Sequence, residues 1–168
     1  MLHQNQNHQK FLVFFETLER FVCVARFVLP GRPQTYKPPR HRHGQKHFYC
    51  GHAKEIKIAR AALEQAWSPR NTINNCAVRL DICACGIRIT PYFVRPRAHF
   101  KKGQLKPDAP NHVLKTPDID NLAKFVLDAL QKKIVSDDKL VTTLVVHKRW
   151  CSTENEQRTV IELRVFNQ

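Results

Sequence analysis

The carboxylates of this chain gather in one short stretch. Only 14 of its 168 residues are Asp or Glu, against 28 Lys and Arg, yet five aspartates fall between positions 118 and 138. A divalent cation cancels the repulsion between carboxylates and a phosphodiester, so acids concentrated in a basic chain favour metal-assisted chemistry on a phosphate. The candidate site is therefore the stretch 116–150, which carries Asp118, Asp120, Asp128, Asp137 and Asp138.

Two pairs of these acids have spacings that such chemistry could use. Asp118 and Asp120 lie two apart in what we expect to be an extended segment, so their side chains would emerge on one side and share a cation. Lys124 follows Asp120 by one helical turn, where it would form a surface ion pair or contact the scissile phosphate. The alternative roles are helix capping for the first pair and a polar turn for Asp137 and Asp138.

A site that uses Asp138 as well requires the chain to fold back. The predicted helix between the two pairs would separate them by about 20 Å at 1.5 Å per residue. Only the segment 132–136 is available to begin that return. The spacing of the acids does not by itself establish that Asp138 comes close to Asp118 and Asp120.

The elements that must position the acids are predicted from hydrophobic periodicity. We expect a helix over 52–67 and another that starts just after Pro117 and runs to 131, with Asp128 on its solvated face. We expect strands at 21–29, 139–150 and 158–166, the last two forming a hairpin. The segments 77–85 and 87–95, broken by Gly86, are expected to form one long bent strand or two adjacent ones. These elements predict a mixed α/β (α+β) fold, a small mixed β-sheet packed with two main helices over 21–168. The extension 1–20 is expected to be partly disordered or an interface helix.

Two acid-poor stretches hold much of the positive charge. The proline-rich stretch 30–51 is expected to form no regular element, and 95–107 mixes cations with His99 and Phe100, as nucleic-acid surfaces or merely solvated loops do. A formal charge of +14 and a pI near 9.9 favour a nucleic-acid partner over anionic lipid. The candidate nucleic-acid-binding residues are Arg32, Lys37, Arg40, Arg42, Arg95, Arg97, Lys101 and Lys102.

The expected setting is the cytoplasm. The apolar run FLVFF at 11–15 is too short for a membrane span or a secretion signal, so we expect no membrane association and no export. The six cysteines are then expected to be reduced thiols, with Cys83 and Cys85 on one side of a strand as small buried residues.

The combination of motifs resembles the RusA family of Holliday-junction resolvases. PDIDNLAKFVLDAL followed by SDDKLV is similar to that family's D-x-D-N-x-x-K helix start and later D-D pair. FVLPGRPQTYKPPR is similar to its first strand and Pro-rich loop, and FVRPRAHF to the stretch before the motif. The resemblance covers about residues 23–166. It implies a homodimeric crossover junction endodeoxyribonuclease, which makes paired symmetric nicks in four-way and branched DNA during recombination and repair.

The resemblance also implies roles for individual residues. Asp118, Asp120 and Asp138 would bind Mg²⁺, for which Mn²⁺ can substitute, and Asp137 is a further candidate ligand. Lys124 would assist catalysis, with Asn121 in a supporting position.

Two other interpretations stay open. One is a non-catalytic, structure-selective DNA-binding protein that retains the fold, which would bind junctions without nicking them. The other is a zinc module, although the spacing of its candidate ligands fits no common zinc pattern. Those ligands are His41, His43, His47, Cys50 and His52.

Overall fold

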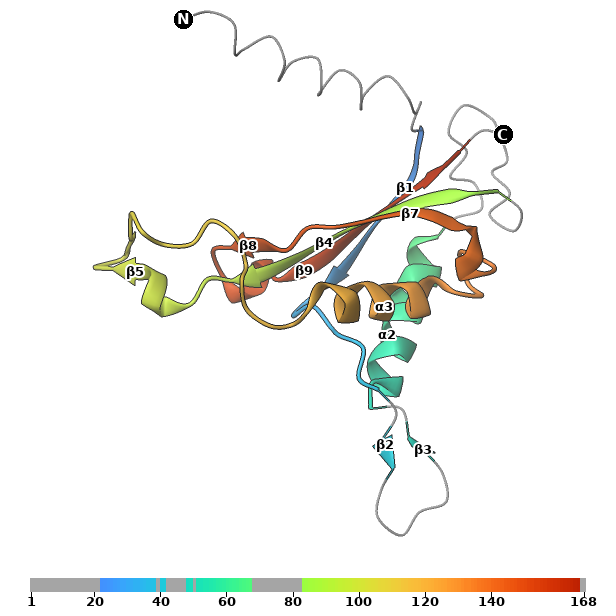
Figure 1. The fold of residues 1–168 in the computed structure, drawn as a ribbon, viewed down its shortest axis with the longest axis horizontal. Helices are drawn as coiled ribbons and strands as arrows, with labels where there is room; N and C mark the ends of the chain where they lie inside the picture. The colour runs from blue at the N-terminus through green and yellow to red at the C-terminus, as the bar shows by residue number, and fades with distance from the viewer. Residues whose placement is uncertain (1–21, 39, 42–47, 50, 68–82, 167–168) are drawn as a thin grey trace, which may run out of the picture.

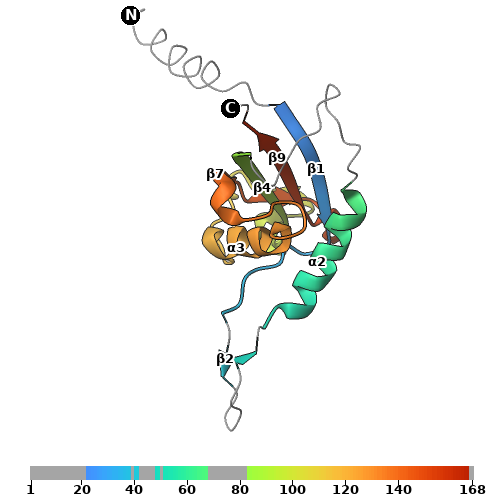
Figure 2. The same cartoon turned by 90° about the vertical axis from the view of Figure 1, so that its right-hand side faces the viewer.

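The computed structural model describes residues 22–38, 40–41, 48–49, 51–67 and 83–166. In this part of the chain, two helices pack on one face of a mixed five-stranded sheet (Figures 1 and 2). The strands are β1 (Val22–Pro30), β4 (Cys85–Val94), β7 (Val141–Val146), β8 (Arg149–Cys151) and β9 (Arg158–Val165). The helices are α2 (Ala53–Ala66) and α3 (Ile119–Leu130). The mixed α/β fold predicted from the sequence is confirmed.

The sheet buries one face because its strands alternate. Phe27, Ile89 and Leu163 point to the helices and are at most 2% exposed. Ala59 and Leu63 of α2 are buried against this layer, as predicted. The whole predicted stripe of α3 is also buried, namely Leu122, Phe125, Val126, Ala129 and Leu130. The apolar periodicity of both helices therefore determines the face that each turns to the core.

The strand order differs from the predicted hairpin. β9 lies between β1 and β4 and is antiparallel to both, while β7 and β8 lie on the other side of β4 and are parallel to it. The predicted strand 139–150 is also split, because the chain leaves the ladder after Val146 and rejoins β4 at Tyr92. The hairpin prediction was wrong because alternation identifies the buried face of a strand but not its neighbour.

Short elements extend from the sheet. β5 (Phe100–Lys101) and β6 (Gln104–Leu105) form a hairpin that projects from the body (Figure 1). Both turn residues have positive φ, 51° at Lys102 and 80° at Gly103, which is the pattern of a two-residue type I′ turn. The described residues also form three short 3₁₀ helices, namely η1 (Arg97–His99), η2 (Asp138–Leu140) and η3 (Glu154–Glu156).

The proline-rich stretch is more ordered than predicted. β2 (Arg40–His41) pairs with β3 (Phe48–Tyr49), so this stretch does contain a short ladder. The predictions for 1–20 and for most of 77–85 fall outside the described residues. Burial raises the pKa of the Cys85 and Cys151 thiols, which keeps them protonated and unreactive. No helix in the described ranges is long and apolar enough to cross a membrane.

Candidate active site

The first acid pair lies at the start of α3. Asp118 is the N-cap residue, with extended backbone (φ −71°, ψ 152°), and Asp120 lies in the first helical turn. The expected extended segment is thus shorter than predicted, because the helix begins at Ile119, between the two acids. Asp118 makes no side-chain capping hydrogen bond, and both carboxylates are exposed. They stand at the positive end of the helix dipole, available to a ligand.

The loop before α3 is held by a lysine that sequence patterns did not single out. Lys148 follows β7, and its Nζ donates hydrogen bonds to the carbonyl oxygens of Lys115 (2.8 Å) and Pro117 (3.2 Å). The end of β7 therefore lies beside the start of α3. Nothing in the local pattern KRW distinguishes this lysine from a solvated one.

The second acid pair lies at the other end of α3. After Leu130 the chain turns tightly, with the amides of Ile134 and Val135 both donating to the Leu130 carbonyl, and both side chains are buried. η2 and β7 follow, and β7 runs back toward Lys148, antiparallel to α3 (Figure 1). The 12 residues of the helix, about 18 Å at 1.5 Å per residue, thus lie between Asp118 and the turn that leads to Asp138.

One chain therefore does not bring the three predicted metal ligands together. Within the described ranges, no group of three or more His, Cys, Asp or Glu side chains is placed to hold a metal ion. The turn at 131–135 does not bring Asp138 back to the first acid pair, because it leads into η2 and β7 from the far end of α3.

Asp137 and Asp138 differ in what they contact. Asp137 caps η2, since its Oδ1 accepts a hydrogen bond from the Lys139 amide at 3.0 Å and its Oδ2 lies 3.3 Å from Lys139 Nζ. The backbone hydrogen bond from Lys139, followed by its side-chain contact, lowers the pKa of Asp137. Asp138 is exposed. The geometry gives Asp137 a structural role in the turn and makes Asp138 the better candidate ligand.

Lys124 is positioned by an aromatic ring. Its Nζ lies 3.9 Å from the centroid of the Tyr36 ring, a cation–π contact. Tyr36 belongs to the extended segment 32–38, and its amide donates to the carbonyl of Asn121 at 2.9 Å. The ammonium is therefore held one helical turn from Asp120. Tyr36 was not among the predicted site residues.

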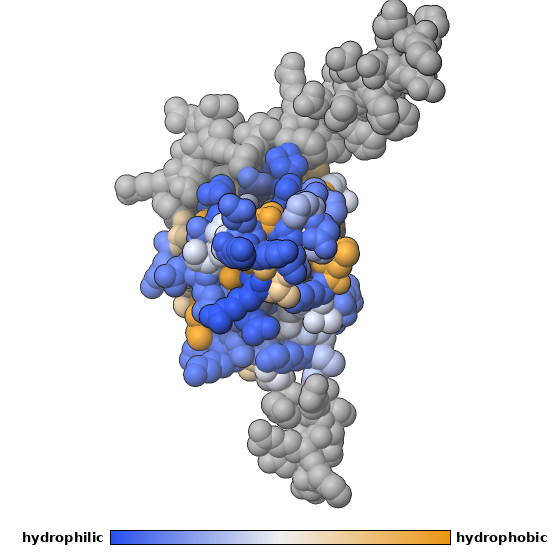
Figure 3. All heavy atoms as spheres, turned by 90° about the vertical axis from the view of Figure 1, so that its left-hand side faces the viewer, coloured by the Kyte–Doolittle hydropathy of each residue, from blue (hydrophilic) through white to orange (hydrophobic). Residues whose placement is uncertain are grey.

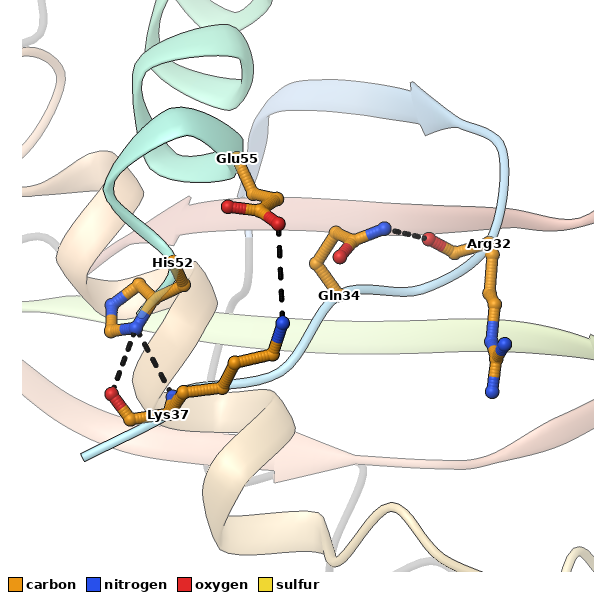
Figure 4. Close-up of polar contacts among 5 residues, drawn as sticks. All are labelled: Arg32, Gln34, Lys37, His52 and Glu55. Carbon is orange, nitrogen blue, oxygen red and sulfur yellow. Dashed lines mark hydrogen bonds and ion pairs between the residues drawn. The ribbon is translucent and has the colours of Figure 1, made fainter. Parts of the chain in front are cut away.

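A buried histidine anchors the same segment (Figure 4). His52 is 2% exposed, and its Nδ1 lies 3.1 Å from the amide nitrogen and 3.0 Å from the carbonyl oxygen of Lys37. Its Nε2 lies 3.9 Å from Oδ2 of Asp128, which favours the tautomer with the proton on Nε2 and the Lys37 amide as donor to Nδ1. Asp128 was predicted to be a solvated helix residue, but it packs beside His52, and its carbonyl accepts from Arg60.

The histidine geometry bears on the zinc interpretation. His52 is the one candidate ligand whose side chain is described, and it serves as an anchor for Lys37. The side chain of His41 and the whole of His43, His47 and Cys50 fall outside the described residues.

Most predicted DNA-binding cations with described side chains are exposed, namely Arg32, Lys37, Arg97, Lys101 and Lys102. Lys37 faces Glu55, at 4.0 Å, while Arg32 points away from both (Figure 4). Arg95 is partly buried, donates a hydrogen bond to the Pro110 carbonyl and lies over the Trp150 ring. It therefore links the loop at Pro110 to β8. The side chain of Arg40 and the whole of Arg42 fall outside the described residues. Viewed from the β5 end, the surface is mostly hydrophilic (Figure 3).

Comparison with models of protein families shows which family this chain belongs to. A family model described as Endodeoxyribonuclease RusA matches residues 30–164, a range that includes both acid pairs and Lys124. The chain belongs to the RusA family. RusA proteins are endodeoxyribonucleases, so membership supports a nuclease that hydrolyses DNA and, broadly, Holliday-junction resolvase activity. A search of curated proteins found no match.

Proposed function

We propose that this RusA-family protein is a metal-dependent endonuclease that resolves four-way DNA junctions by paired symmetric nicks, in recombination and repair inside the cell. The observation that carries the proposal is the exposed pair Asp118 and Asp120 at the start of α3, one turn from Lys124 and inside the matched range. A solvated polar helix end would not need an ammonium fixed over an aromatic ring.

The donor set fits a hard divalent cation. Mg²⁺ is commonly bound by one or two carboxylates with water and substrate phosphate oxygens, and Mn²⁺ accepts the same donors. Asp118 and Asp120 would hold the ion, which when bound would neutralise the phosphate and lower the pKa of a water molecule. Lys124 would place a positive charge beside the phosphate or the leaving oxygen, and Tyr36 would keep the ammonium in that position.

A second subunit would complete the ligand set. In a homodimer with two α3 helices antiparallel across a two-fold axis, the Asp138 end of one helix would lie beside the Asp118 end of the other. This arrangement would form two equivalent sites, as paired nicks on symmetric strands require. The support is the position of the two acid groups at opposite ends of one helix.

The exposed cations would bind the arms of the junction. Arg32 and Lys37 lie on the segment that crosses the start of α3, and Lys101 and Lys102 lie on the projecting hairpin. Arg97 precedes that hairpin, and we propose that Arg40, Arg42 and Arg95 add to the same positive surface. Phosphate contacts of this kind give an affinity that falls steeply with salt.

Cleavage of labelled four-way, three-way and linear duplex DNA, with and without Mg²⁺, tests this proposal. We expect Mg²⁺-dependent nicking of the four-way junction in preference to the linear duplex. Asp120→Asn should abolish it, while Lys57→Gln on the exposed side of α2 should not. Binding without nicking in either Mg²⁺ or Mn²⁺ would favour the alternative, a non-catalytic structure-selective DNA-binding protein.

A further inference from the structure

The face of the sheet opposite to α2 and α3 carries a group of arginines that the proposed active site does not use. In the described part of the chain, both helices lie on one side of the sheet (Figure 2). The residues that alternate with the buried ones on β1, β9 and β4 point to the other side. Five of them are charged, namely Arg26, Arg88, Arg158, Glu162 and Arg164.

Arginines form two rows across this face. In the first row Glu162 pairs with Arg26 on β1 and with Arg88 on β4, and Arg88 lies 3.6 Å from its carboxylate. In the second row Tyr92 pairs with Arg158 on β9 and with Arg149 on β8, and the Arg158 guanidinium lies 4.2 Å from the Tyr92 ring centroid. The two rows thus contain four arginines and one acid, Glu162.

The rows border a hollow of about 570 Å³. Its lining includes Arg26, Arg88 and Arg149 with His147, and Tyr92 and Trp150 supply aromatic surface. Arg26, His147 and Arg149 are exposed, and the Arg88 side chain is 45% exposed. The rows are four residues apart on β4, about 13 Å, which is close to the 12 Å or so between the backbones that border a DNA major groove.

We propose that this arginine face binds the phosphate backbone of DNA. A second copy of the chain fits the face poorly, because a symmetric contact would bring two copies of the same arginine-rich surface together. Arginine guanidinium groups suit phosphate by geometry and charge. The inference rests on the proposed function for the choice of DNA among polyanions. Since the face lies across the sheet from α3, it would hold a junction arm other than the one being cut.

Binding measurements in a cleavage-deficient Asp120→Asn background test this inference. The double variant Arg26→Gln with Arg88→Gln is compared with Lys54→Gln with Lys57→Gln, which removes the same charge from exposed positions on α2. We expect the arginine variant to raise the Kd for a four-way junction about tenfold and to reduce the slope of log Kd against log salt by about 2. The lysine variant should leave the slope unchanged.

Two further variants keep the result interpretable. Arg26→Lys with Arg88→Lys retains the charge and should retain most of the affinity, and Arg149→Gln should reduce the slope by about 1 even if the double variant does not fold. Equal slopes in the arginine and lysine variants would overturn the inference. So would an altered sedimentation mass in the arginine variant, because the face would then be a contact between copies.

The nuclease proposal is judged separately, from nicking by the unmodified protein in Mg²⁺. If nicking is absent while the arginine face still controls DNA binding, the proposed function fails and this inference stands.

Discussion

At the scale of single residues, the candidate site combines Asp118 and Asp120 at the start of α3 with Lys124, whose ammonium lies over the Tyr36 ring. The sequence placed Asp118, Asp120 and Lys124 at the start of a helix because proline, aspartate and the apolar stripe all act locally. It could not predict that Tyr36 lies under Lys124, because that contact joins residues 88 positions apart. Long-range packing decides such contacts, and no local pattern reports it.

The two adjacent acids should respond differently to the same substitution. We expect Asp138→Asn to lower nicking at least about 100-fold, because a ligand of the metal would lose its charge. Asp137→Asn should stay within about threefold of the parent protein, since its carboxylate caps η2 and contacts Lys139. Rates of junction nicking at saturating Mg²⁺ measure both. The reverse order of effects would show that Asp137 is the ligand.

The Tyr36 ring should matter for turnover. A cation–π contact contributes about 0.5 to 1 kcal/mol, so Tyr36→Leu should lower kcat by roughly two- to fivefold with little change in junction Kd. Tyr36→Phe keeps the ring and should keep the rate. Single-turnover nicking together with a binding assay separates the two quantities. A loss of rate in Tyr36→Phe equal to that in Tyr36→Leu would argue against a role for the ring face.

At the scale of elements, the two helices could be predicted and the sheet order could not. The stripes of α2 and α3 each have one buried side, so their extent follows from local periodicity. The place of β9 between β1 and β4 depends on which strands meet in three dimensions. The anchoring role of His52 could not be predicted either, because this residue belongs to a basic, histidine-rich stretch whose composition is typical of a solvated surface.

The link between α2, α3 and the segment 32–38 should depend on His52. We expect His52→Ala to reduce the free energy of unfolding by about 2 to 3 kcal/mol, because it removes the hydrogen bond to Lys37 and the ring packing against Tyr36 and Phe125. Urea unfolding measures this loss. The exposed His112→Ala is the matched control. If both variants unfold within about 0.5 kcal/mol of each other, His52 is not an anchor.

At the scale of the whole molecule, the length of α3 sets the main constraint. The helix is about 18 Å long. Asp118 lies at its start, and Asp138 follows the buried turn at Ile134 and Val135 beyond its other end. The chain thus carries Asp118 and Asp120 at one end of the helix and Asp138 beyond the other end. In a symmetric dimer, Asp118 and Asp120 of each subunit would combine with Asp138 of the other to form two metal sites. Such a dimer accounts for acids that are far apart in a single subunit.

Co-expression of two inactive variants tests this account most directly. Asp120→Asn and Asp138→Asn, carrying different affinity tags, are each expected to lack Mg²⁺-dependent nicking alone. In mixed dimers one site would combine the intact Asp120 of one subunit with the intact Asp138 of the other. Random pairing should then restore nicking at about a quarter of the parental site number. Activity in either variant alone, or no recovery in purified mixed dimers, would contradict the account.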